Sequence, residues 1–293
     1  MRDFYITTDS DSDLPIEYIQ KYNTTIIPQY YSFDDTIYGG DLHMTPTDFY
    51  IRMRNGSLPQ SHANDPIVIE EKFRTILDKG ADIIHISFSS ALSISYNNVC
   101  TVARALEKEY EGSRITVVDS LNVSLGEAIM VIYANRLKEQ GTSYDEIIIW
   151  LNEFRHHINV QFTVDDLFHL QRGGRVSRTT ALIGSAFNIK PFMHVTKNGT
   201  IAYAGNVHGR KRSIITLVDR MKTTLNDNID YTLPVGVVHA NCYEEAKSLA
   251  KLIKLKTKFK NVIINDISPS IGTHSGPGAL GIMYYGSIKP FEA

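Results

Sequence analysis

The sequence predicts an α/β protein of two domains, an N-terminal parallel-sheet α/β domain and a C-terminal mixed-sheet α/β domain. The chain has 293 residues, about twice the length of a common domain. In its first half, strand patterns alternate with helical periodicity, which is typical of right-handed crossovers and a parallel sheet. Near residue 160 the strand patterns come closer together. We therefore expect domains of residues 1–160 and 161–293.

The first elements are a strand, a polar loop and a second strand. Phe4–Thr7 has a strand pattern and leads into Thr8–Asp13, whose Asp and Ser side chains favour turns and caps. Thr25–Phe33 predicts another strand, and Pro28 favours an edge position because proline cannot donate a ladder hydrogen bond. Thr45, followed by a proline, predicts the start of a helix.

The central strand of the first sheet is predicted at Asp82–Phe88, a nearly continuous apolar run of the kind found in parallel sheets. Apolar side chains three or four positions apart then predict a helix over 99–110. The strand pattern of Ile115–Val118 follows, and helices are expected over 129–137 and 147–154. This alternation predicts a sheet covered by helices on both faces.

The second half opens with three strand patterns, at Asn159–Val164, Phe192–Val195 and Thr200–Val207. Lys197–Thr200 joins the last two, and its Asn-Gly pair is a strong hairpin signal. A strand–helix–strand unit is expected over 235–264. Closely spaced strands with one such unit predict a mixed sheet.

The composition excludes several classes of protein. Thirty Lys and Arg stand against 32 Asp and Glu, so a net charge of -2 gives no reason to expect a nucleic acid partner. Two cysteines cannot cross-link a fold of this size, which predicts a reducing, cytoplasmic location. No apolar run approaches the ~20 residues of a membrane span, so we expect a soluble protein without stable membrane insertion.

Polar residues follow two of the predicted parallel strands. Ser89–Ser93 follows the central strand, and Asp119–Gly126 follows the next one. Ligands of open α/β sheets bind at such strand ends, where helix N-termini offer free N–H groups. Ser93 is therefore a candidate anion ligand. The alternative is that these residues only cap the helices that follow.

Two loops and a basic segment could complete a site. Ile271–Gly278 has three glycines and a proline, which predicts a tight loop presenting His274 between two hydroxyls. Histidine suits a carboxylate or phosphate near neutral pH, although a structural role is the alternative. Leu58–Pro66 is a polar loop that contains Ser61. The alternative is that this segment only begins the helix that follows, with Pro66 at its first position. Arg172–Arg178 could hold an anion or remain a solvated loop.

Local enzyme and cofactor signatures are absent. Gly276–Gly281 fits G-x-G-x-x-G, but too little chain follows for a dinucleotide-binding unit. His156 and His157 diverge on a helix, so we expect no metal site there. No nucleophile elbow or phosphate loop occurs, and we expect no enzyme activity. The alternative is a Ser/His acyl hydrolase or acyltransferase with Ser93 as nucleophile and His274 as base.

Together these segments resemble the DegV family of bacterial fatty-acid-binding proteins over almost the whole chain. The matching motifs keep the order and spacing of the family. They are Thr8-Asp9-Ser10 with Asp13-Leu14-Pro15, Ser89-Ser90-Ala91-Leu92-Ser93, Val118-Asp119-Ser120 with Ser124-Leu125-Gly126, Asp166-Leu167 with Leu170, Gly173-Gly174-Arg175 with Ser177, Asn188-Ile189-Lys190-Pro191, and Ile271-Gly272-Thr273-His274-Ser275-Gly276-Pro277-Gly278.

The resemblance implies a two-domain carrier that buries one long-chain fatty acid between or within its domains and uses no cofactor. It is similar to the fatty-acid-binding component of bacterial fatty acid kinase. There, a separate ATP-using subunit phosphorylates the acyl carboxylate for phospholipid synthesis. The carboxylate contacts of the family carry over onto Ser61, Ser93 and His274, with Ser61 where the family has threonine. A cationic His274 would hold the carboxylate most strongly.

The same resemblance suggests the partner contacts and the apolar tunnel. Where the family commonly has an arginine before a basic stretch, this chain has His208, and Arg210 could replace that arginine. We expect Arg175 and Arg210 in surface turns that face a kinase partner. The tunnel residues expected from the sequence are Ile94, Phe162, Phe187, Ile189 and Met193.

Overall fold

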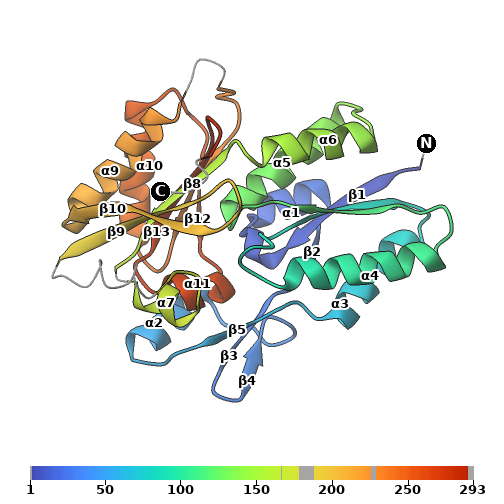
Figure 1. Ribbon diagram of the computed structural model, residues 1–293, viewed down its shortest axis with the longest axis horizontal. Helices are drawn as coiled ribbons and strands as arrows, with labels where there is room; N and C mark the ends of the chain where they lie inside the picture. Colours follow the sequence, from blue (N-terminus) through green and yellow to red (C-terminus); the bar gives the residue numbers. More distant parts are fainter. Residues whose placement is uncertain (1, 166, 178–187, 226–228, 290–293) are drawn as a thin grey trace.

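A parallel sheet and a mixed sheet lie side by side in the computed structural model (Figure 1), which describes residues 2–165, 167–177, 188–225 and 229–289. A third, small sheet lies below them in the view of Figure 1, near the ends of both larger sheets. The α/β architecture, with a parallel sheet first and a mixed sheet second, is therefore as the sequence predicts.

The parallel sheet has the strand order β2-β1-β6-β7. Every residue of the central strand β6 is buried, which explains its continuous apolar sequence. Helices α3 and α4 cover one face, and α5 and α6 cover the other. The bounds are β1 Phe4–Asp9, α1 Ile16–Tyr22, β2 Thr25–Ile27, α3 Pro66–Leu77, β6 Asp82–Ser87, α4 Ser95–Glu109, β7 Ile115–Asp119, α5 Leu125–Glu139 and α6 Tyr144–Phe154.

The small sheet corrects the single strand expected over Thr25–Phe33. The chain leaves the parallel sheet after β2, and the next strand, β3, belongs to a different sheet, of order β4-β3-β5. Pro28 lies in the break because it has no N–H to continue the ladder. The bounds are β3 Tyr30–Phe33, β4 Thr36–Tyr38, α2 Pro46–Arg54 and β5 Gln60–His62.

The mixed sheet has the order β10-β9-β8-β13-β11-β12, in which only β11 and β12 pair in parallel. Helices α9 and α10 pack on one face through an apolar cluster. The bounds are β8 Ile158–Thr163, β9 Ile189–Val195, β10 Ile201–His208, α9 Arg210–Thr223, β11 Val235–His239, α10 Tyr243–Lys256, β12 Val262–Asp266 and β13 Leu280–Tyr285. The chain thus changes sheets with β8, and a domain boundary at residue 160 stays a prediction.

His274 lies in a helix, which corrects the tight loop expected over Ile271–Gly278. Helix α11 (Pro269–Ser275) begins with a proline at its first turn, and it ends at Gly276, whose φ of 72° is favourable only for glycine. Gly272 therefore lies within the helix, and Gly276 ends it. Helix α11 packs beside the short helix α7 (Phe168–Arg172), below the mixed sheet in Figure 1.

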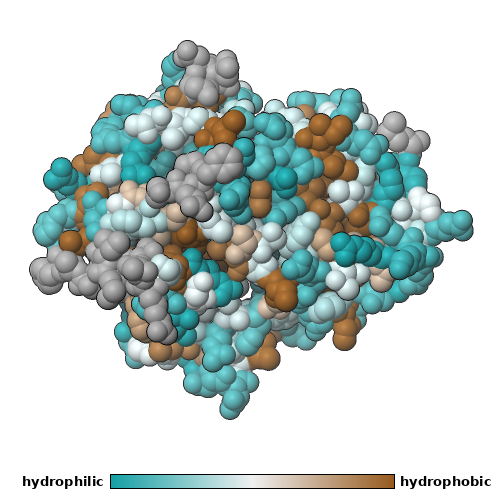
Figure 2. Space-filling model, viewed as in Figure 1, coloured by the Kyte–Doolittle hydropathy of each residue, from teal (hydrophilic) through white to brown (hydrophobic). Residues whose placement is uncertain are grey.

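The surface in Figure 2 shows hydrophobic residues dispersed in small groups among hydrophilic ones. Such dispersed exposure is ordinary for a protein surface. In the described part of the chain, no helix is long and apolar enough to span a membrane.

Candidate functional site

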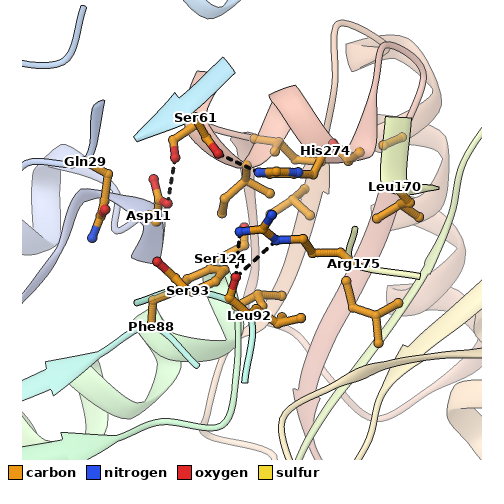
Figure 3. Close-up of a pocket in the computed structure, with 18 of the residues that line it drawn as sticks. Asp11, Gln29, Ser61, Phe88, Leu92, Ser93, Ser124, Leu170, Arg175 and His274 are labelled. Atoms are coloured by element: carbon orange, nitrogen blue, oxygen red, sulfur yellow. Dashed lines mark hydrogen bonds between the residues drawn. The ribbon is translucent and has the colours of Figure 1, made fainter. Parts of the chain in front are cut away.

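A cavity of about 220 Å³ lies where the two large sheets, the small sheet and α11 meet. Most of its wall is apolar, but polar side chains gather around one part of it (Figure 3). The apolar side chains include Phe88, Val123, Phe162, Val238, Ile271 and Met283. A mostly apolar cavity with a few convergent polar groups is the usual form of a small-ligand site.

Ser61 and His274 meet at this cavity although 213 positions separate them in the chain. Ser61 is held by β5, where it pairs with Tyr31, and His274 lies in the last turn of α11. Ser61 Oγ and His274 Nε2 are 2.7 Å apart, which is hydrogen-bond distance. The other ring nitrogen of His274 has no hydrogen-bond partner in the described structure.

Ser93 lines the same cavity from the turn between β6 and α4. Its hydroxyl donates to Ser95 Oγ at 2.9 Å, and Ser95 donates to Gln29 Oε1 at 2.9 Å. Gln29 in turn donates through Nε2 to Asp9 Oδ1 at 3.2 Å. A chain of hydrogen bonds therefore runs from the cavity wall to a buried carboxylate of the parallel sheet.

Asp9 ends this chain as an ionised group. Burial alone would raise the pKa of Asp9, but the hydrogen bond and charge of His85 and the bonds from Phe88 and Ser87 lower it below its ordinary value. The Phe88 N–H donates to Asp9 at 2.8 Å and the Ser87 hydroxyl at 2.9 Å. Because ionised Asp9 only accepts, it fixes the Gln29 amide with its oxygen toward Ser95.

Arg175 lies in the cavity wall, which corrects its expected place in a partner-facing surface turn. Its Nε and Nη2 donate to the Leu92 carbonyl at 3.1 and 2.9 Å, and a third N–H donates to Gly173. The turn at Gly173 and Gly174 folds the guanidinium back over the Ser89–Ser93 segment. Burial lowers the pKa of Arg175, which remains within the range of a cation.

His274 is neutral near pH 7, contrary to the cationic imidazole expected from the sequence. Burial, together with the charges of the neighbouring Arg175, Arg172 and His169, lowers its pKa to about 3. Two arginines from the α7 region therefore supply the positive charge at this end of the cavity.

The structure brings only some of the expected tunnel residues to the cavity. Ile94 lines its mouth and is 63% exposed, and Phe162 lines its interior. Ile189 and Met193 are absent from the wall; Met193 is buried in the core beside Phe162, its partner across β8 and β9. Phe187 lies outside the described residues.

The two remaining residues of the predicted site lie away from the cavity. His208 is exposed at the end of β10. Arg210 begins α9 and forms an ion pair with Glu245, with Nη2 and Oε2 2.6 Å apart. An arginine held by a carboxylate within its own chain has fewer N–H groups to offer a partner.

The cavity wall includes six polar residues that were not predicted from the sequence as ligand contacts, namely Asp11, Gln29, His62, Ser124, Ser270 and Ser275. The acidic loop that contains Asp11 was visible as a polar strand end. Gln29 had no local signal, because it reaches the cavity only where Pro28 interrupts the strand. Among the described residues, no three His, Cys, Asp or Glu side chains are placed to hold a metal ion.

Comparison with known proteins gives consistent matches over the whole chain. A family model described as an uncharacterised protein of the DegV family matches residues 3–287. A DegV domain-containing protein of Clostridium perfringens is 33% identical over 291 residues, which cover 99% of this chain and 99% of that protein.

Two solved structures have the same fold. DegV of Bacillus subtilis, described as a fatty acid binding protein, matches with a TM-score of 0.82 and 26% identity, covering 98% of this chain and 100% of that one. A DegV family protein of Thermus thermophilus, described by its fatty acid binding, matches with a TM-score of 0.85 and 24% identity over 98% and 100% of the two chains.

Proposed function

The chain belongs to the DegV family, and we propose that it binds one long-chain fatty acid in the cavity and holds the carboxylate with Ser61, Ser93 and His274. The relative from Bacillus subtilis, described as a fatty acid binding protein, supports this ligand class. The observation that carries the proposal is the meeting of Ser61 and His274 at 2.7 Å beside Ser93, in the wall of a mostly apolar cavity.

A buried carboxylate needs hydrogen-bond donors and a compensating charge. With its proton on Nε2, the neutral imidazole donates to Ser61 Oγ, which leaves the Ser61 hydroxyl hydrogen for the ligand. Ser93 turns its hydroxyl from Ser95 to the second carboxylate oxygen. Arg175 supplies positive charge at the same end of the cavity, and three of its five N–H groups are already used within the chain.

The acyl tail provides most of the affinity. Each methylene removed from water contributes ~0.8 kcal/mol, so a ligand with a long chain binds chiefly through apolar surface. The polar residues then set which end of the ligand lies near the mouth.

Titration with a fluorescent fatty acid tests the carboxylate contacts. The single variants Ser61→Ala, Ser93→Ala and His274→Ala should each weaken binding roughly 10- to 150-fold, because a hydrogen bond to a charged group contributes about 1.5–3 kcal/mol. Binding of the methyl ester should change much less. Equal losses for acid and ester would place the carboxylate elsewhere, and lipid-free protein that binds neither would end the proposal.

A kinase subunit that phosphorylates the bound acid is part of the same proposal. The mouth beside Ile94 gives the carboxylate end a route to the surface, and His208 is exposed with Lys211 and Arg212 nearby in sequence. Mixing the loaded protein with a purified fatty acid kinase subunit and ATP should give acyl phosphate, and His208→Ala should slow this reaction without releasing the lipid. Product formation that is insensitive to His208→Ala would place the contact elsewhere.

One observation favours the second candidate, an acyl hydrolase. Ser61, and not the Ser93 expected from the sequence, lies at nucleophile–base distance from His274. A pKa of about 3 makes His274 a weak base, and no carboxylate orients its Nδ1 in the described structure. We therefore expect no turnover of p-nitrophenyl acyl esters, and turnover that Ser61→Ala abolishes would establish the hydrolase.

A further inference from the structure

The cavity has a second polar region that the carboxylate contacts do not use. Its members are Asp11, from the acidic loop after β1, with Ser270 and Ser275 of α11. All three are at least nine-tenths buried and line the cavity. An unsubstituted acyl tail offers no hydrogen-bonding group to these side chains.

Ser275 is the unmatched member of this region. Its side chain is 8% exposed, and its Oγ has no hydrogen-bond partner. The nearby Tyr50 hydroxyl donates to the Ile267 carbonyl at 2.9 Å, so it can accept from the Ser275 hydroxyl but cannot donate to Ser275 Oγ, which is left without a donor. A buried hydroxyl without a partner is costly, so a ligand group that bonds to it is favoured.

Asp11 is a buried carboxyl group in the wall of the cavity. It accepts hydrogen bonds from Ser270 at 3.0 Å and Ser268 at 3.4 Å. Burial and the charges of Asp13 and Asp9 raise the pKa of Asp11 well above its ordinary value, which favours the protonated form. A protonated carboxyl group is both a donor and an acceptor.

The helix α11 fixes how far this region lies from the carboxylate. Ser270 and His274 are four residues apart and share one face of α11, about one helical turn or 5.4 Å from each other along the axis. Ser275 is adjacent to His274 in the chain. A ligand whose carboxylate meets the Ser61 hydroxyl, beside His274, therefore places its first few carbon atoms beside the second polar region.

We propose that the preferred ligand is a fatty acid with a hydroxyl group on the carbon β to the carboxyl group, bound by Asp11 and Ser275. This inference rests on the proposed function and names its substrate class. The β-hydroxyl accepts the proton of Asp11 and donates its own to Ser275 Oγ. A β-oxo group only accepts, so it would satisfy one of these two partners.

Competition binding to the delipidated full-length chain tests the proposal, with palmitate, β-hydroxypalmitate and ω-hydroxypalmitate as the probes. The β-hydroxy acid should bind about tenfold more tightly than palmitate, the effect of one well-placed buried hydrogen bond. The ω-hydroxy acid should bind more weakly than palmitate, because its hydroxyl enters apolar surroundings. This comparison uses the unmodified protein, so it does not depend on the folding of a variant.

Ser275→Ala should remove most of the preference for the β-hydroxy acid over palmitate, measured as the ratio of the two affinities in the same variant. Ser248→Ala, on the exposed face of α10, is the matched control and should leave the preference intact. Palmitate binding as tight as β-hydroxypalmitate binding, or a preference that survives Ser275→Ala, would overturn the inference while the carrier function stands. Failure of all three acids to bind would overturn both.

Discussion

At the scale of single residues, the candidate site depends on which atom holds each hydrogen. The neutral ring of His274 orients the Ser61 hydroxyl instead of meeting the carboxylate as a cation. Ionised Asp9 similarly orders Gln29, Ser95 and Ser93 through a chain of three hydrogen bonds. Each carboxylate contact is therefore supported by a residue behind it that the ligand does not touch.

Removal of His274 should weaken binding by the same factor between about pH 5 and pH 8, because a pKa of about 3 leaves the imidazole neutral throughout that range. The double variant Ser61→Ala/His274→Ala should bind no more weakly than the worse single variant, since His274 acts through Ser61. Titrations of the fatty acid at both ends of the pH range measure these effects. A loss that grows toward acidic pH would show that His274 binds the ligand as a cation. Additive losses would show that His274 acts independently of Ser61.

At the scale of elements, α7 and α11 pack so closely that a glycine is required between them. A Cβ added to Gly173 would lie 2.0 Å from His274 Nδ1, whereas one added to Gly174 would meet nothing within 4 Å. The Gly-Gly pair thus has two separate roles. Gly173 makes room for the imidazole, and Gly174 has a positive φ of 72°.

Gly173→Ala should therefore displace His274 and weaken fatty acid binding about as much as His274→Ala does. Gly174→Ala is the matched control, because it adds backbone strain of order 1 kcal/mol without a contact. It should lower thermal stability and leave binding of the correctly folded protein intact. Equal binding by both variants would show that the imidazole can move aside without loss.

The sequence predicted the long, strongly patterned elements and failed where tertiary contacts decide the structure. The run Asp82–Phe88 was predicted as the central strand because its nearly continuous apolar residues indicate burial on both faces, and β6 is buried throughout. The three-residue strands β4 and β5 have too few positions to show a period, and they are strands only because β3 lies between them. Leu280–Tyr285 was missed as a strand because its role depends on pairing with β8 and β11, distant in sequence.

The candidate site follows the same division. Ser61, Ser93 and His274 came from motifs, and the structure brings all three to one cavity. Arg175 lies in a motif, but the sequence does not indicate where its side chain points. In the structure, the guanidinium is oriented by its hydrogen bonds to the Leu92 carbonyl. Gln29 had neither a motif nor a directional signal. It reaches the cavity because the chain passes from one sheet to another beside it, and this break forms only in the assembled fold.

At the scale of the whole molecule, the acidic loop after β1 connects the two large sheets. Asp13 accepts a hydrogen bond from the Ser268 N–H at 3.0 Å, just before α11, and another from the Ser124 hydroxyl, just before α5. The Asn265 side chain donates to the Asp13 carbonyl at 2.7 Å. Burial raises the pKa of Asp13 to about 7.

Because folding raises this pKa above the ordinary 3.8, the protonated carboxyl is the form that the folded state favours. Its contribution to stability is complete below about pH 3.8 and is lost as the pH rises through about 7. The variant Asp13→Asn lacks this titration, so its free energy of unfolding relative to the parent should increase across that window. Urea unfolding at a series of pH values measures the difference.

Burial of His274 acts in the opposite direction over an overlapping window, since its pKa is lowered to about 3, and both proteins share that effect. The difference between Asp13→Asn and the parent therefore reports the Asp13 carboxyl group together with its charge effect on Asp11. Asp34→Asn, at a side chain 87% exposed, is the control and should follow the parent at every pH. A constant difference between Asp13→Asn and the parent would mean that Asp13 does not change protonation within the window.

The distance of 213 residues between Ser61 and His274 also orders events in time. A ribosome delivers Ser61 and Ser93 long before α11 emerges, so a growing chain has part of the apolar wall but lacks Ile271, Met283 and the imidazole of His274. Lipid capture therefore belongs to the finished fold and cannot guide its early assembly. A chain cut short before α11 would expose apolar surface with no ligand to cover it, which makes such fragments natural targets for chaperones and proteases.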